Sequence, residues 1–271
     1  MKIALVDNGS LEPAAHESLR RAADEIARAT GMAVDAVSWK HSDRIAAASL
    51  AEGPAWTLAP WVRAQVAAGE REFVLIPFFI SPQGAIGSSL RAELDSLRST
   101  TGGFACSFTE GLAEGSLLAE IVAARIREAA ADLGRPAVIV VDHGGPSPAS
   151  AAVRDRVAKG ARAILGSSVG ALTAASMESP AGDGFAFNRP LLAEALRMPG
   201  FNSGDVLIAP LFLSPGRHAG PRGDLVRIAG EAQDASPGLR CHFTQLIGSH
   251  PAATAFLADA LSRALKVGAH T

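Results

Sequence analysis

The feature that most constrains the fold of this chain is an internal repeat. Three segments of the first half recur in the same order in the second: residues 3–10 resemble 138–145, 74–82 resemble 208–215, and 104–109 resemble 239–244. Asp7 and Asp142 are 135 positions apart, as are the two cysteines, and the matched prolines are 133 apart. Three matches at nearly one spacing predict two copies of one unit in the 271 residues. We predict domains of residues 1–133 and 134–271, joined at a Gly-Arg-Pro segment.

Charge and cysteine content exclude several classes of protein. The 25 basic and 27 acidic residues nearly balance, whereas nucleic-acid-binding proteins usually carry a basic excess. Two cysteines without a CxxC motif exclude a disulfide framework and a CxxC metal site. The apolar start is interrupted by Asp7, too early for a signal-peptide core or a membrane span. We therefore expect a cytoplasmic protein with no nucleic-acid or membrane partner.

In each copy, short apolar runs alternate with stretches of helical periodicity. In the first copy the runs predict strands near residues 2–7, 33–38, 73–80 and 104–109, and helices over 19–29, over part of 54–68, and near 88–97 and 116–130. Strands alternating with helices favour right-handed crossovers and a parallel sheet. Continuously apolar strands indicate a sheet covered on both faces. The predicted fold class is α/β, with two tandem flavodoxin-like domains, each a small parallel sheet with helices on both faces.

Ligands of open parallel sheets bind beyond the carboxyl ends of the strands. At these ends the copies differ: His143 stands where the first copy has Asn8, and His218 aligns with Ala85. Glu178 falls about opposite Lys40. Neutral imidazoles ligate transition metals and accept protons near neutral pH, and a nearby carboxylate can assist them. The second copy is therefore the expected site of metal or proton-transfer chemistry.

These motifs resemble the sirohydrochlorin chelatase family, the class II cobalto- and ferrochelatases. The resemblance rests on Asp-His-Gly-Gly at 142–145 and on the apolar strand that ends in Ser-Pro-Gly-Arg-His at 214–218. Residues 176–178 and 247–251 are also similar to family segments. Gly145 stands where a serine is usual, and the histidine pair lies in the second half instead of the first. The resemblance covers the whole chain as a tandem of two family units.

The resemblance implies ATP-independent insertion of Co²⁺ or Fe²⁺ into sirohydrochlorin, a lyase reaction of cobalamin or siroheme biosynthesis. His143 and His218 would act on the metal and the pyrrole protons, with Glu178 as an accessory catalytic carboxylate. The metal is a substrate, and no permanently bound cofactor is expected. The ligand would lie in a cleft whose opposite wall comes from the first half, near Asn8, Ser81 and Ala85. The chain would act as a monomer or homodimer.

Other residues have weaker claims. Arg217 and Arg222 flank His218 and could pair with the carboxylates of an acidic tetrapyrrole, or simply form a solvated basic loop. Cys106 and Cys241 are expected to be small core residues, and His250 to mark a helix start. The alternative function is a non-catalytic tetrapyrrole or metal carrier with the same fold, which the retained histidine pair disfavours.

Overall fold

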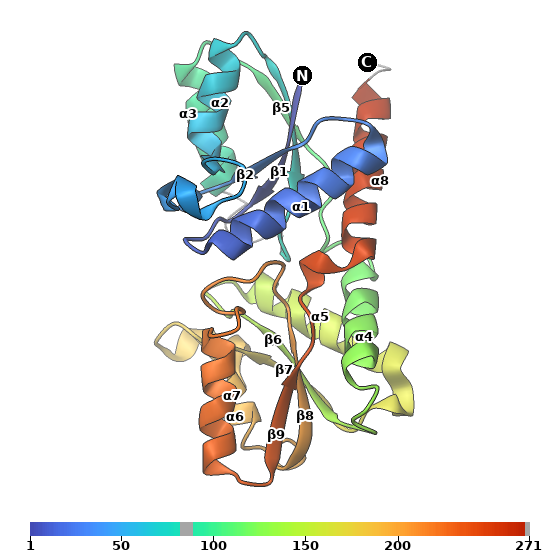
Figure 1. Ribbon diagram of the computed structural model, residues 1–271. Coiled ribbons are helices and arrows are strands. Elements are labelled where there is room, and N and C mark those ends of the chain that lie inside the picture. Colours follow the sequence, from blue (N-terminus) through green and yellow to red (C-terminus); the bar gives the residue numbers. More distant parts are fainter. Residues whose placement is uncertain (82–88, 269–271) are drawn as a thin grey trace. The chain divides into compact units, whose positions relative to one another are not determined.

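The computed structural model describes residues 1–81 and 89–268, and they form two compact units (Figure 1). The first contains Met1–Glu114 together with the segment that begins at Gly248. The second contains Gly115–Ile247. Among the described residues, no helix is long and apolar enough to cross a membrane.

The first unit is built on a five-stranded parallel sheet with the order β3-β2-β1-β4-β5. Its strands are β1 (Lys2–Asp7), β2 (Asp35–Ser38), β3 (Trp56–Thr57), β4 (Glu72–Pro77) and β5 (Ala105–Phe108). Its helices are α1 (Pro13–Thr30), α2 (Leu58–Ala67), α3 (Arg91–Thr100) and α8 (Pro251–Gly268). Side chains from α2 and α3 share a buried cluster with Ala4 and Val6 of β1. The buried faces of α1 and α8 contact each other.

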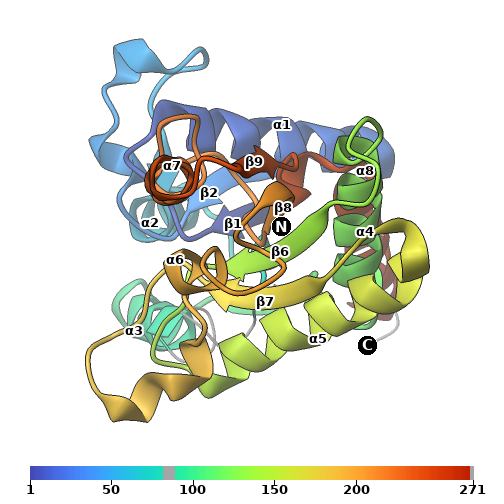
Figure 2. The same cartoon turned by 90° about the horizontal axis from the view of Figure 1, so that it is seen from below.

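The second unit has a four-stranded parallel sheet with the order β7-β6-β8-β9. Its strands are β6 (Ala137–Asp142), β7 (Leu172–Ser176), β8 (Gly204–Pro210) and β9 (Leu239–Phe243). Its helices are α4 (Leu117–Ala129), α5 (Pro148–Leu165), α6 (Leu192–Ala195) and α7 (Asp224–Ala235). Figure 2 shows α6 and α7 on one side of this sheet and α4 and α5 on the other. The predicted fold class, two parallel α/β sheets covered by helices, is confirmed.

The compact units do not follow the predicted boundary between residues 133 and 134. The helix that follows β5, α4, packs against α5 in the second unit, where Arg127 donates a hydrogen bond to the carbonyl of Ile164 at 2.9 Å. The last helix, α8, packs against α1 in the first unit, where Thr254 donates to Glu25 at 2.8 Å. The two repeats therefore exchange their terminal helices: α4 belongs to the second unit and α8 to the first.

Smaller differences concern element ends. The strand predicted over 73–80 ends at Pro77, whose ring removes a backbone donor. The helix predicted over 54–68 divides into the short edge strand β3 and the helix α2. At the predicted junction, β6 begins directly after Pro136. Ala85, which aligns with His218 in the comparison of the two repeats, lies outside the described residues.

Candidate metal-insertion site

The candidate site lies at the carboxyl edge of the second sheet, where three strands end. His143 follows β6 directly, Glu178 comes two residues after β7, and His218 stands on the loop between β8 and α7. The strand order places β6 between β7 and β8. Because the carboxyl ends of parallel strands meet at one edge, these three loops are neighbours.

The two predicted histidines form a pair. Their ring centroids are 4.7 Å apart, and the rings are nearly perpendicular at 83°. Nδ1 of His218 lies 2.7 Å from Oδ2 of Asp224, and Nδ1 of His143 lies 2.9 Å from the carbonyl oxygen of Gly144. Each Nδ1 faces an acceptor, an arrangement that favours a proton on Nδ1, and in the neutral ring this leaves the Nε2 lone pair for a ligand. Two imidazole nitrogens are thus available to bind a metal or to accept a proton.

Acidic groups flank the pair on both sides. Oε1 of Glu178 lies 3.6 Å from Nε2 of His143. Hydrogen bonding to His218 is the main reason that the pKa of Asp224 is lowered, so Asp224 is a carboxylate near neutral pH. The exposed fractions of the His143, Glu178 and His218 side chains are 47%, 59% and 29%, which leaves all three accessible to a ligand.

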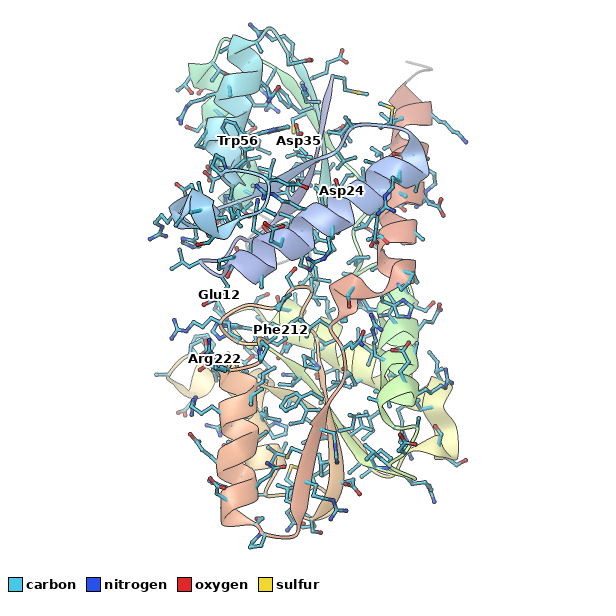
Figure 3. The ribbon with its side chains drawn as sticks, in the orientation of Figure 1. Glu12, Asp24, Asp35, Trp56, Phe212 and Arg222 are labelled. Atoms are coloured by element: carbon cyan, nitrogen blue, oxygen red, sulfur yellow. The ribbon has the colours of Figure 1, made fainter. Side chains whose placement is uncertain are left out.

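These side chains line a pocket of about 360 Å³. Its lining consists of His143, Met177, Glu178, Arg217, His218, Asp224, Arg227 and Ile228. Arg217 lines this pocket, whereas Arg222, labelled in Figure 3 on the loop before α7, is exposed and does not line it. Sequence reasoning missed Arg227 and the role of Asp224 as the partner of His218. Asp224 and Arg227 are three residues apart at the start of α7, a spacing that puts both side chains on one face of the helix and could have indicated Arg227.

The close approach of the β6 and β7 loops depends on glycine. Gly144 has a φ of +81°, and a Cβ there would lie 1.9 Å from the carbonyl oxygen of Glu178. The backbone N–H of Glu178 donates to the carbonyl of His143 at 3.1 Å. Only glycine accepts both this φ and this contact without strain. The Asp-His-Gly sequence thus carries a backbone requirement as well as the imidazole.

The first unit has the same backbone contact between two loops, but without a histidine and a glutamate at the corresponding positions. The N–H of Lys40 donates to the carbonyl of Asn8 at 3.2 Å, the contact that Glu178 makes with His143. Gly9 has a φ of +86°, and a Cβ there would lie 1.7 Å from the Lys40 carbonyl oxygen. The predicted equivalence of Asn8 with His143 and of Lys40 with Glu178 is therefore confirmed.

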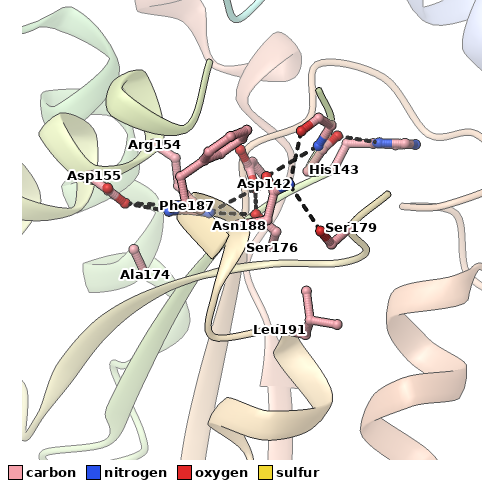
Figure 4. A network of polar contacts seen from close by, with 12 residues as sticks. Asp142, His143, Arg154, Asp155, Ala174, Ser176, Ser179, Phe187, Asn188 and Leu191 are labelled. Carbon is pink, nitrogen blue, oxygen red and sulfur yellow. Dashed lines mark hydrogen bonds and ion pairs between the residues drawn. The ribbon is translucent and has the colours of Figure 1, made fainter. Parts of the chain in front are cut away.

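A buried polar network lies beneath the site (Figure 4). Ser176 donates to Oδ1 of Asp142 at 2.6 Å, and Arg154, 2% exposed, donates to Ser176 at 2.5 Å. Arg154 also donates to the carbonyl of Phe187 at 2.9 Å. Burial raises the pKa of Asp142, while Ser176 and Arg154 counter that rise. The network fixes the residue that directly precedes His143.

The remaining predicted residues have structural surroundings. The cysteines Cys106 and Cys241 are free and half-buried, and burial raises the pKa of each thiol to about 11. His250 accepts a hydrogen bond from the N–H of Ala252 at 3.2 Å and so marks the start of α8, as predicted. Within the described residues, no group of three or more His, Cys, Asp or Glu side chains is arranged to hold a metal ion.

Comparisons with known proteins identify a matching family model and similar folds. A family model described as CbiX matches residues 137–264. No curated protein matches the chain. SirB from Bacillus subtilis with Fe³⁺ is 14% identical, with a TM-score of 0.69 over 97% of this chain and 95% of that one. The sirohydrochlorin chelatase SirB from Bacillus subtilis subspecies spizizenii in complex with cobalt is 14% identical, with a TM-score of 0.68 over 97% and 94%.

A third solved structure is CbiX, described as the terminal enzyme of siroheme biosynthesis in denitrifying bacteria. It is 17% identical and has a TM-score of 0.63 over 97% of this chain and 99% of that one. The likeness to all three extends over both repeats, so the shared fold includes the first half. The resemblance predicted from the motifs is confirmed: residues 137–264 match the CbiX family model, and the chain as a whole has the fold of SirB and CbiX.

Proposed function

We propose that this chain inserts a divalent metal, Co²⁺ or Fe²⁺, into sirohydrochlorin without ATP. The observation that carries the proposal is the pair of imidazoles at 4.7 Å, each with Nδ1 held by an acceptor. The family match over residues 137–264 supports the same reaction. In this proposal the metal is a substrate, and His143 and His218 are its ligands.

The chemistry follows from what metal insertion requires. Two pyrrole N–H protons leave the macrocycle, and ring nitrogens replace water on the metal. Imidazole nitrogens bind divalent cobalt and iron and can also accept protons near neutral pH. Glu178, 3.6 Å from His143, can take up a proton passed on by that ring. Activity should fall in acid, because a protonated imidazole can perform neither task.

Arginines at the pocket suit an acidic substrate. Arg217 is 83% exposed and only 3.9 Å from Asp224, so its guanidinium can turn toward a ligand. Arg227 is held by Glu231 at 2.7 Å and is less available. We propose that Arg217 pairs with a peripheral carboxylate of the tetrapyrrole. Arg222 would contribute only if the substrate extends beyond the pocket.

Metallation can be followed directly in the absorption spectrum. Purified protein is mixed anaerobically with sirohydrochlorin and Co²⁺, and the rate is compared for wild type, His143→Ala, His218→Ala and Asn8→Ala. Both histidine variants should lose most of the metallation rate, whereas Asn8→Ala should retain most of it. Binding of the tetrapyrrole by wild type without metallation would support the carrier instead. Loss of activity in Asn8→Ala alone would place the site in the first repeat.

A further inference from the structure

Asn188 lies at the end of an irregular segment, η5 (Asp183–Asn188), and is only 1% exposed. Its carboxamide makes three hydrogen bonds, drawn in Figure 4. Nδ2 donates to the carbonyl of Gly145 at 2.9 Å and to Oγ of Ser179 at 3.2 Å, and Oδ1 accepts from the N–H of Gly145 at 3.3 Å. A single buried side chain thus joins two loops.

Those two loops carry the candidate catalytic groups. Gly145 is two residues after His143, and Ser179 directly follows Glu178. Nε2 of His143 and Oε1 of Glu178 are 3.6 Å apart, which is too long for a hydrogen bond between these exposed side chains. Their separation must therefore be fixed by the backbone that carries them. Asn188 is the side chain that links that backbone on both sides.

The first repeat provides an internal comparison. Ser10, the counterpart of Gly145 at a spacing of 135, has both backbone groups bonded to Oγ of the buried Ser42, at 3.2 and 3.1 Å. Oγ of Ser42 also lies 2.8 Å from Oγ of Ser38, within β2, so its one hydroxyl proton is shared between Ser38 and the Ser10 carbonyl. A buried side chain thus binds the same backbone position in both repeats, Ser42 at Ser10 and Asn188 at Gly145. Asn188 also bonds to Ser179, the residue that follows Glu178.

We propose that Asn188 is a positioning residue that sets the separation of His143 and Glu178 for metal handling. The inference rests on the proposed function, since it assigns Asn188 to that site. Groups that hold metal ligands in place typically change metal affinity or activity about 10–100-fold when removed. Asn188→Ala should therefore weaken Co²⁺ binding and slow metallation by about tenfold or more.

The test uses Co²⁺ alone, titrated into the full chain, with metallation kinetics and thermal melting measured in parallel. Ser42→Ala is the matched control, because it removes the equivalent clamp from the repeat that lacks the counterparts of His143 and His218. It should lower the melting temperature while leaving Co²⁺ affinity within about twofold of wild type. Ser179→Ala deletes one of the hydrogen bonds of Asn188 and should also weaken Co²⁺ binding, but by less than Asn188→Ala. If Asn188→Ala fails to fold, the Co²⁺ affinity of Ser179→Ala tests the inference in its place.

Unchanged Co²⁺ affinity in Asn188→Ala, or in Ser179→Ala if the former does not fold, would overturn the inference. An equal loss of affinity in Ser42→Ala would also overturn it, because the effect would then come from general loosening of the fold. If the wild-type chain binds no Co²⁺, there is no metal site for Asn188 to position, and the inference is also overturned. If wild type binds Co²⁺ but metallates nothing, the proposed function fails while the affinity comparison still tests Asn188.

Discussion

Asp7 and Asp142 end the first strand of their repeats, but in the described ranges 1–81 and 89–268 only Asp142 has a cationic partner. Arg154 lies beside Asp142, whereas the position 135 residues earlier in α1 is the fully buried Leu19. Oδ1 of Asp7 is enclosed and has no hydrogen-bond partner in the described part of the chain. Burial raises the pKa of Asp7 from 3.8 to about 6, although Ser38 and the loop backbone donate to it. We predict that Asp7→Asn stabilises the protein at neutral pH.

The size and the sign of this stability change follow from the raised pKa of Asp7. Below pH 3.8 the carboxyl is protonated in both the folded and the unfolded chain and has no effect. Between pH 3.8 and about 6 the unfolded chain loses this proton while the folded chain keeps it, so stability falls as pH rises. At about 1.4 kcal/mol per pKa unit, the loss approaches about 3 kcal/mol above pH 6. Asparagine has the same shape and does not ionise, so it avoids this loss.

Urea denaturation of wild type and Asp7→Asn at pH 4, 5, 6 and 7.5 measures the effect. The two proteins should be nearly equal at pH 4, and the variant should gain about 1–3 kcal/mol at pH 7.5 with an unchanged m value. The control is Asp142→Asn, which should be destabilising at pH 7.5 because it removes a charge partner from buried Arg154. A stability difference between wild type and Asp7→Asn that does not change with pH would refute the reasoning.

Three further predictions concern the site. Arg217→Ala should raise KM for the tetrapyrrole several-fold with a smaller change in kcat, and Arg222→Ala should do less because Arg222 lies outside the pocket; steady-state kinetics with unchanged KM in both would reject the carboxylate role. Asp224→Asn should lower kcat/KM about 10–100-fold by releasing Nδ1 of His218, and a fully active variant would contradict this. Gly144→Ala should lower the thermal midpoint and activity together, because its Cβ would lie 1.9 Å from a carbonyl oxygen; a midpoint equal to that of wild type would show that the loop adapts.

Much of the fold could be predicted from sequence because each strand and helix has its own local pattern. Continuous apolar runs such as residues 138–141 predict buried parallel strands, and the repeat then fixes the order of the elements. The pairing of His143 with His218 could be anticipated because both follow strands that parallel topology makes adjacent.

The exchange of terminal helices could not be predicted, because α4 and α8 both have an apolar face that fits either sheet. Which unit each helix covers depends on long-range packing, such as the contact of Thr254 with Glu25. Asn188 was missed for a related reason. It stands in an irregular segment, and nothing in the local sequence indicates that its carboxamide reaches Gly145 and Ser179.

We propose that the histidine pair of the second repeat holds the metal during insertion. The decisive test of this role is a crystal structure of the full chain soaked with Co²⁺, with the ion located by anomalous scattering. We expect one ion bonded to Nε2 of both His143 and His218, at about 2.0–2.1 Å as for imidazole ligands of zinc. Cobalt bound only elsewhere, with the two rings still facing each other and empty, would contradict the account.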